Sequence, residues 1–225
     1  MTIVQPDGFL ALPRAGTGPG VLVLHAWWGL NDTIKAVCRR LACSGYVAFA
    51  PDLYHGKVAD TIAGAETLGS AIDANHLQAE AEVAQAAQFL SQRVGQAGPG
   101  QAVIAFSLGG YYALHLAAAD PEHLRSVVLF YGTEGSMGSD FSNSRADYLG
   151  HFAGNDQYET RSNVDILEAS LRRAGRPVKF HTYPGTSHWF FEKDRVDAYN
   201  APAARLAWRR TLAFLRATLA PQATR

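Results

Sequence analysis

Short apolar runs alternate with longer stretches of helical spacing along almost the whole chain, and this alternation restricts the fold more than any other feature. The run Gly20–His25 is apolar and lies between glycine-containing turns, which is typical of a strand buried on both faces. Further runs of strand character are found at Tyr46–Ala50, Ala102–Phe106, Ser126–Tyr131, Tyr148–Ala153 and Val178–Tyr183. The alternation predicts right-handed crossovers, and therefore an α/β fold in which a mostly parallel sheet carries helices on both faces.

The intervening segments have the apolar spacing of amphipathic helices. Thr33–Ser44 is such a segment, and it stops at Gly45, where a glycine commonly follows the last helical turn. The other predicted helices are 76–94, 108–119, 163–174 and 196–218, with a shorter one around Asp60–Leu68. Residues 132–146, rich in Gly and Ser, predict an irregular connection. Because one sheet needs all of these strands at once, residues 1–225 are predicted to form a single domain.

Charge and cysteine content restrict the partners and the location. The 20 basic and 20 acidic side chains give a formal net charge of zero, so without clustered Lys and Arg we expect no nucleic-acid partner and no attraction to a membrane. No apolar run approaches the ~20 residues of a membrane span, and no secretory signal pattern is visible. Cys38 and Cys43 point to different faces of one predicted helix, which excludes a disulfide framework and favours the reducing cytoplasm.

Ser107 lies at the junction between a predicted strand and a predicted helix, followed by Leu108-Gly109-Gly110. The small residues Ala105 and Gly109 on either side of it fit the tight turn of a nucleophile elbow, which exposes a serine hydroxyl at a helix N-terminus. Serine is also a common helix N-cap, so the same residues are compatible with a capped helix start alone.

A serine hydroxyl needs a base to take its proton, and the chain has eight histidines. His188 stands directly after the last predicted strand, in a turn-rich loop. Asp156 occupies the matching position after the preceding strand, where a carboxylate would orient the imidazole and stabilise its charged form. The order Ser107, Asp156, His188 is that of the α/β-hydrolases. The alternatives are that Asp156 is only a turn residue and that His188 is only a hydrogen-bonded loop histidine.

Stabilising the oxyanion of such a reaction requires backbone N–H donors. Leu108, the residue after Ser107, would supply one donor, and the loop that contains Trp27 would supply the other. Trp28, Tyr131 and Phe190 are predicted to wall an apolar pocket for uncharged acyl or alkoxy groups of modest size. Plain core packing is the alternative for the adjacent indoles of residues 27 and 28.

Six stretches distributed along the chain match one family pattern. They are Pro-Gly-Val-Leu-Val-Leu-His-Ala-Trp-Trp-Gly-Leu-Asn at 19–31, Gly-Tyr-Val-Ala-Phe-Ala-Pro-Asp-Leu-Tyr at 45–54, Ala-Phe-Ser-Leu-Gly-Gly at 105–110, Phe-Tyr-Gly at 130–132, Gly-Asn-Asp at 154–156 and Gly-Thr-Ser-His-Trp-Phe-Phe at 185–191. In these stretches the sequence resembles the dienelactone hydrolase family of α/β-hydrolases. The resemblance implies a three-layer α/β sandwich and hydrolysis of ester or lactone carbonyls, with the nucleophile at Ser107, the acid at Asp156 and the base at His188. It also implies oxyanion donors on the main chain of Trp27 and Leu108.

Three features depart from that family's pattern. The family nucleophile is usually cysteine, whereas Ser107 is far less acidic and depends wholly on its histidine for activation. Ala26 stands where the family often has a glutamate that interacts with the nucleophile. The arginines that hold the substrate carboxylate in dienelactone-cleaving members have no clear counterpart, and the acidic Glu192 follows His188 where a cation would be wanted.

The sequence therefore predicts a serine hydrolase that cleaves small carboxylic esters or lactones through an acyl-enzyme. The alternatives are acyl transfer or cleavage of another activated ester, including phosphoesters, a non-catalytic member of the same scaffold, and a Cys-to-Ser variant of a cysteine dienelactone hydrolase. The expected partner is a small ester or lactone. Metal-ligand spacing and a Gly-rich cofactor loop are both missing, so no metal and no cofactor are expected. A monomer is expected, with a homodimer as the alternative.

Overall fold

A seven-stranded sheet forms the centre of the computed structural model, which describes residues 4–94, 100–133 and 140–220. The strands are β1 (Gly8–Ala11), β2 (Gly20–Leu24), β3 (Val47–Pro51), β4 (Gln101–Phe106), β5 (Leu124–Phe130), β6 (Asp147–Ala153) and β7 (Val178–Tyr183). Their order across the sheet is β1-β3-β2-β4-β5-β6-β7, and every neighbouring pair is parallel except β1 with β3. The prediction of an α/β fold with a mostly parallel sheet is confirmed.

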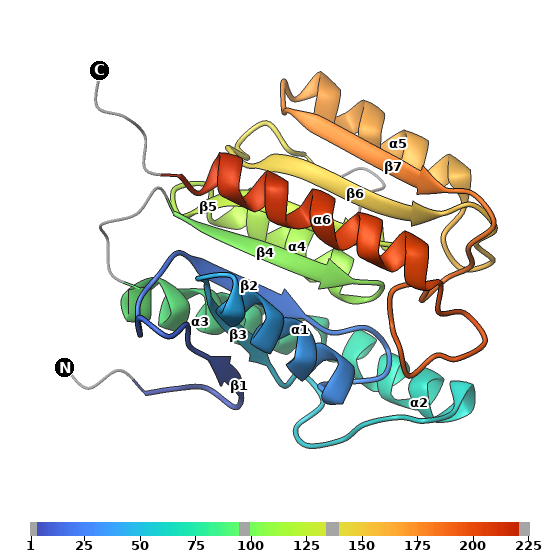
Figure 1. Cartoon of the computed structure of the whole chain (residues 1–225), viewed down its shortest axis with the longest axis horizontal. Coiled ribbons are helices and arrows are strands. Elements are labelled where there is room, and N and C mark those ends of the chain that lie inside the picture. The colour runs from blue at the N-terminus through green and yellow to red at the C-terminus, as the bar shows by residue number, and fades with distance from the viewer. Residues whose placement is uncertain (1–3, 95–99, 134–139, 221–225) are drawn as a thin grey trace.

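Helices cover both faces of this sheet, which gives three layers (Figure 1). They are α1 (Asp32–Cys43), α2 (Ile62–Asp73), α3 (His76–Val94), α4 (Gly109–Ala119), α5 (Arg161–Arg173) and α6 (Ala201–Thr218). Helices α1 and α6 pack on one face, while α3, α4 and α5 pack on the other. None of the helices in the described part of the chain is both long and apolar enough to cross a membrane.

The predicted elements are present, with boundaries that differ by a few residues. Helix α2 continues to Asp73, beyond the expected end. Helix α6 begins later than expected, because the side chain of Asn200 caps it by accepting a hydrogen bond from the N–H of Ala203. The sequence analysis does not predict β1, a four-residue edge strand that is only partly buried. Of the irregular connection expected at 132–146, residues 134–139 lie outside the described residues.

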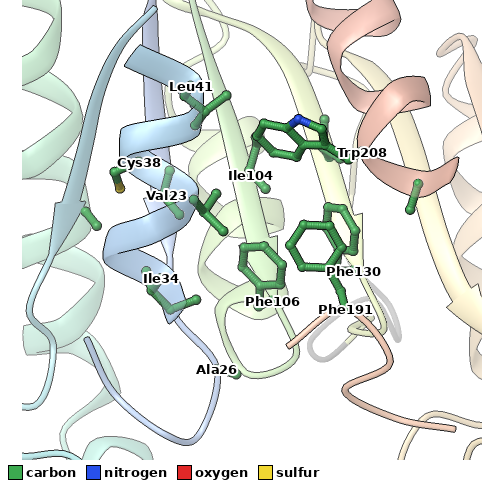
Figure 2. Close-up of a cluster of buried hydrophobic side chains, with 14 of the residues drawn as sticks. Val23, Ala26, Ile34, Cys38, Leu41, Ile104, Phe106, Phe130, Phe191 and Trp208 are labelled. Carbon is green, nitrogen blue, oxygen red and sulfur yellow. The ribbon is translucent and has the colours of Figure 1, made fainter. Parts of the chain in front are cut away.

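The core consists of two apolar layers, one on each side of the sheet. In β2, Val21 and Val23 face the layer under α1 and α6, whereas Leu22 and Leu24 face the layer under α3 and α4. This is the alternation that a strand imposes on successive side chains. Figure 2 shows the first layer, in which helical side chains pack over the strands, among them Ile34, Cys38, Leu41 and Trp208. Both faces are buried, as the continuous apolar runs predict.

The topology places the ends of the central strands at one edge. Strands β4, β5, β6 and β7 are parallel neighbours, so the loops after their last residues meet at the same edge of the sheet. Ser107, Tyr131, Asp156 and the loop of His188 all follow these strand ends. In open parallel sheets of this kind, ligands bind beyond the carboxyl ends of the strands.

Candidate active site

Ser107 occupies a strained turn between β4 and α4. Its φ angle of 49° is left-handed, which is uncommon for a residue with a side chain. Hydrogen bonds hold the turn on both sides: the N–H of Ser107 donates to the carbonyl of Phe130 over 2.9 Å, and the N–H of Gly110 donates to the carbonyl of Ser107 over 2.7 Å. The alternative in which Ser107 only caps the helix is wrong, because no side-chain hydrogen bond caps α4 and the Ser107 hydroxyl faces His188 instead.

Glycine is required beside this turn by close packing. A Cβ added to Gly109 would lie 2.9 Å from both the Cβ and the carbonyl oxygen of Leu24 on β2. A Cβ on Gly132, after β5, would collide with the carbonyl of Ser107. The elbow is therefore pressed between two neighbouring strand ends, and this explains the small residue two positions after Ser107.

Ser107, His188 and Asp156 form a continuous chain of hydrogen-bond contacts. The Oγ of Ser107 lies 2.9 Å from Nε2 of His188, and Nδ1 of His188 lies 2.9 and 2.8 Å from the two carboxylate oxygens of Asp156. A carboxylate only accepts, so Nδ1 carries the proton and Nε2 faces the serine hydroxyl as an acceptor. The side chains of the imidazole and the carboxylate are only 5% and 4% exposed, respectively, and Ser107 is also buried.

Asp156 also has the turn role that the sequence left open. Its Oδ1 accepts the backbone N–H groups of Tyr158 and Glu159, each over 2.9 Å. These bonds fix the carboxylate in place after β6. The two interpretations of Asp156 are compatible, since the same side chain organises the turn and contacts His188.

Leu108 directly follows Ser107, and Trp27 lines the same cavity as Ser107. Neither the N–H of Leu108 nor that of Trp27 donates a hydrogen bond within the residues that the structure describes. The Leu108 N–H stands at the N-terminus of α4, where the helix dipole favours negative charge. The loop of Trp27 is fixed by its own backbone, with the N–H of Gly29 bonded to the carbonyl of Ala26 over 3.1 Å.

A cavity of about 220 Å³ opens at Ser107 and His188. Its aromatic walls are Trp27, Tyr131, Tyr158 and Trp189, and Glu159 also lines it. A larger groove of about 540 Å³ lies beside it and shares Tyr158, His188 and Trp189 with it.

Of the three residues predicted to wall one pocket, Trp28 and Tyr131 line two different spaces and Phe190 lines neither. Trp28 borders the larger groove, and Tyr131 borders the cavity. The expectation for Phe190 is corrected: its side chain is fully buried, with its ring 5.5 Å from that of Tyr131 and 5.0 Å from that of Tyr183. The physical reason is the turn at Trp189, whose φ of 63° redirects the chain so that the next residue points into the core.

Sequence reasoning missed a buried pair behind His188. The hydroxyl of Tyr131 donates a 2.8 Å hydrogen bond to Oε1 of Glu192, and the Tyr131 ring lies 4.9 Å from that of His188. Burial raises the pKa of Glu192 to about 8. The nearest signal in the sequence is an acidic residue four positions after His188, which by itself does not reveal burial.

Glu159 is the second residue that the sequence did not single out. It is buried at the wall of the cavity, and its Oε2 accepts the backbone N–H of Thr133 over 2.6 Å. Burial raises its pKa, an effect partly offset by hydrogen bonding to Thr133 and Asn163. Within the described ranges, no group of three or more His, Cys, Asp or Glu side chains is arranged to hold a metal ion.

Comparisons with known proteins identify the family of the chain. The family model described as "Dienelactone hydrolase family" matches residues 7–219. "Protein usf" of Aquifex pyrophilus is 32% identical over 217 residues, which cover 95% of this chain and 94% of that protein. A protein named "Putative carboxymethylenebutenolidase" from Aquifex aeolicus is 29% identical over 220 residues, which cover 96% of this chain and 95% of that protein.

A solved structure shares the fold. It is that of a dienelactone hydrolase-like promiscuous phosphotriesterase, P91, from metagenomic libraries, and it superposes with a TM-score of 0.83 at 22% identity. The match covers 94% of this chain and 92% of that one. Because the family model spans every strand of the sheet, the chain belongs to the dienelactone hydrolase family and has its α/β-hydrolase fold.

Proposed function

We propose that this protein hydrolyses small carboxylic esters or lactones, with Ser107 as the nucleophile of an acyl-enzyme mechanism. The observation that carries the proposal is the unbroken chain of contacts from Asp156 through His188 to the Ser107 hydroxyl at the wall of a cavity. Membership of a hydrolase family supports the reaction class.

In the first half of the reaction, Oγ of Ser107 attacks the substrate carbonyl carbon while Nε2 of His188 takes the hydroxyl proton. The carbonyl π electrons move onto the oxygen, which becomes an oxyanion. The unused N–H groups of Leu108 and Trp27 are the donors for this charge, and one such donor is typically worth about 10²–10³ in kcat. Asp156 holds the imidazole in the required tautomer and stabilises its charged form.

The tetrahedral intermediate then collapses to an ester of Ser107. The bond between the carbonyl carbon and the alkoxy oxygen breaks, and His188 gives its proton to that oxygen. In a lactone the released alcohol remains attached to the acyl group. Water next attacks the acyl-enzyme with His188 as the base, and the acid is released with Ser107 restored.

The cavity supports small, uncharged acyl groups. Its volume is about 220 Å³, at the small end for ligand pockets, and four aromatic rings wall it. Glu159 is its acidic lining residue, and His188 is the one lining side chain there that can become positively charged. A substrate carboxylate would therefore find no arginine or lysine among the lining residues.

Serine in place of cysteine makes the reaction dependent on the base. A serine hydroxyl is not held as an anion near neutral pH, so activation rests on the 2.9 Å contact with His188. Ala26 is a buried apolar residue and supplies no carboxylate beside the nucleophile.

The test is turnover of short-chain p-nitrophenyl esters, combined with labelling by a fluorophosphonate probe. We expect ester hydrolysis, and labelling of wild-type protein and of the exposed control Ser70→Ala, but neither in Ser107→Ala. A protein that neither turns over esters nor takes the label is a non-catalytic member of the scaffold. Faster release of the phenol with added alcohol, together with a new ester product, would indicate acyl transfer instead.

Two further measurements separate the remaining alternatives. Turnover of a phosphotriester that exceeds turnover of every carboxylic ester would assign the site to phosphoester chemistry. A Ser107→Cys variant with much higher ester turnover than the wild type would indicate that the site is built for a thiolate. The proposal predicts that carboxylic esters are turned over faster than the phosphotriester. It also predicts that the wild type turns over esters faster than Ser107→Cys does.

A further inference from the structure

The groove of about 540 Å³ borders the proposed base, His188. The side chains of His188, Tyr158 and Trp189 line both this groove and the small cavity, so the two spaces meet at these residues. The ring of Tyr158 lies 5.1 Å from that of His188 and 4.9 Å from that of Trp189. Ser107 lines the cavity but not the groove. A substrate carbonyl at Ser107 therefore has a small space on one side and a larger one beyond the imidazole.

The proposed mechanism decides which half of an ester enters which space. His188 gives its proton to the departing alkoxy oxygen, so that oxygen stands beside the imidazole. The acyl group is bonded to Ser107, which shares the cavity with Tyr131 and Gly132 after the end of β5. The acyl group therefore occupies the cavity, and the alcohol portion extends past the imidazole into the groove.

The walls of the groove carry exposed apolar side chains. Ile62, Tyr158 and Val196 are 47%, 37% and 80% exposed, and all three line the groove. They come from three separate segments: the first residue of α2, the turn after β6 and the loop between β7 and α6. Exposed apolar residues that gather around one concave surface are typical of a binding site. The groove is therefore suited to an apolar group.

The charges around the groove disfavour an anionic occupant. Asp60, Asp194 and Asp197 line it. Arg195 is the one arginine or lysine among its described lining residues. The guanidinium of Arg195 donates a 2.9 Å hydrogen bond to Oδ2 of Asp194 and lies 3.9 Å from the centre of the Trp28 ring. Three carboxylates beside one paired cation would repel a negatively charged alcohol portion.

The loop that carries Val196 is fixed to the start of α1. Oδ1 of Asp194 accepts a hydrogen bond from the hydroxyl of Thr33 over 2.6 Å, and Oδ2 accepts one from the side-chain amide of Asn31 over 3.1 Å. These bonds join two segments that are far apart in the sequence. This wall of the groove is therefore formed before a substrate binds, which reduces the ordering cost of binding.

We infer that the groove binds the alcohol portion of the substrate, so that the preferred substrates are esters of a short acyl group with a longer, apolar alcohol. This inference rests on the proposed ester hydrolysis and names its substrate class. The cavity of about 220 Å³ limits the acyl group, whereas the groove of about 540 Å³ accepts a larger group. Each methylene group that the groove removes from water strengthens binding by about fourfold.

The experiment compares two isomeric esters, hexyl acetate and ethyl hexanoate. They have the same atomic composition and differ in which side of the ester group carries the longer chain. The ratio of kcat/KM for hexyl acetate to kcat/KM for ethyl hexanoate is divided by the ratio of their alkaline hydrolysis rates. This corrected ratio is measured in wild type, Val196→Asp and Ile62→Asp. Leu77→Asp, which replaces an exposed apolar residue of α3 outside the groove, is the matched control.

We expect the corrected ratio to favour hexyl acetate by tenfold or more in wild type and in the control. A carboxylate at position 62 or 196 replaces apolar surface on the groove wall, so the ratio should fall threefold or more in at least one of these variants. Both positions are exposed, so the substitutions leave the core intact. A wild-type ratio below tenfold, or a smaller fall than threefold in both variants, would overturn the inference.

The failure of this inference is distinguishable from failure of the proposed function. If the wild type hydrolyses p-nitrophenyl acetate but hydrolyses neither isomer, or shows no preference between them, the assignment of the groove is wrong and ester hydrolysis stands. If p-nitrophenyl acetate is not hydrolysed and Ser107 takes no fluorophosphonate label, the proposed function is wrong and the inference is lost with it.

Discussion

The hydroxyl of Tyr131 donates a 2.8 Å hydrogen bond to Glu192, a glutamate with no exposed surface that stands four residues after His188. The same tyrosine lines the cavity of Ser107, and its ring contacts that of His188. Oε2 of Glu192 has no hydrogen-bond partner within the described residues. The loop that supplies the base is thus joined to the loop after β5 by a buried carboxyl group.

The burial of Glu192 predicts a pH dependence of stability. Its pKa is raised from 4.5 in the unfolded chain to about 8 in the folded protein. Its neutral form is favoured in the fold, so the contribution to stability is full below pH 4.5 and is lost as the pH rises through 8. Between pH 5 and pH 8 the wild type should lose about 3 kcal/mol from this group.

Urea unfolding of wild type and Glu192→Gln at several pH values measures this effect. The amide does not ionise, so the difference in unfolding free energy between the two proteins should shift in favour of the variant by about 3 kcal/mol from pH 5 to pH 8. The exposed substitution Glu66→Gln is the control. Its unfolding free energy should change with pH in the same way as that of the wild type. Parallel curves for Glu192→Gln would show that Glu192 is not held neutral.

Tyr131→Phe tests the hydrogen bond itself. Removing the hydroxyl leaves both oxygens of a buried carboxyl group unpaired, so we expect a loss of about 1–3 kcal/mol in unfolding free energy. In a double-mutant cycle with Glu192→Met, the double variant should be more stable than the sum of the single effects predicts. Additive effects would contradict the pairing.

Asp156→Asn separates orientation of His188 from the turn. The amide keeps an oxygen that can accept the N–H groups of Tyr158 and Glu159, so melting temperature should change little. The wrong histidine tautomer is favoured, however, and kcat for a p-nitrophenyl ester should fall by about 10⁴. A lower melting temperature with kcat unchanged would leave Asp156 as a turn residue only.

Gly109→Ala tests the close packing of the elbow. The added Cβ would meet Leu24 at 2.9 Å, so we expect a destabilisation of about 1–3 kcal/mol and loss of ester turnover as Ser107 is displaced. Gly45→Ala is a control for backbone strain, because its φ is +94° and no atom lies within 4 Å of the added Cβ. That variant should lose stability but retain turnover; equal turnover in both variants would contradict the packing argument.

The sheet could be predicted because its central strands are buried on both faces. Continuous apolar runs then mark β2 to β6 directly. Strand β1 escaped prediction because it is short and partly exposed, and its pairing with β3 depends on a distant segment. The proximity of Ser107, Asp156 and His188 could be predicted because each lies just after a predicted strand. Parallel strands bring their carboxyl ends to the same edge of a sheet.

Side-chain environments could not be predicted in the same way. Glu159 and Glu192 are acidic residues in loops, where solvent exposure is the ordinary expectation, and only tertiary packing buries them. Phe190 was expected at the pocket, but the left-handed residue before it turns the ring into the core. Ser107 resembles a helix cap in sequence, yet its hydroxyl faces His188 and no side chain caps α4.

The most direct test of the account is the mass of the protein quenched shortly after mixing with p-nitrophenyl acetate. The account predicts a transient adduct of one acetyl group that peptide mapping places on Ser107, with neither adduct nor turnover in Ser107→Ala. Full turnover in Ser107→Ala, or an acetyl group carried on another residue, would contradict it.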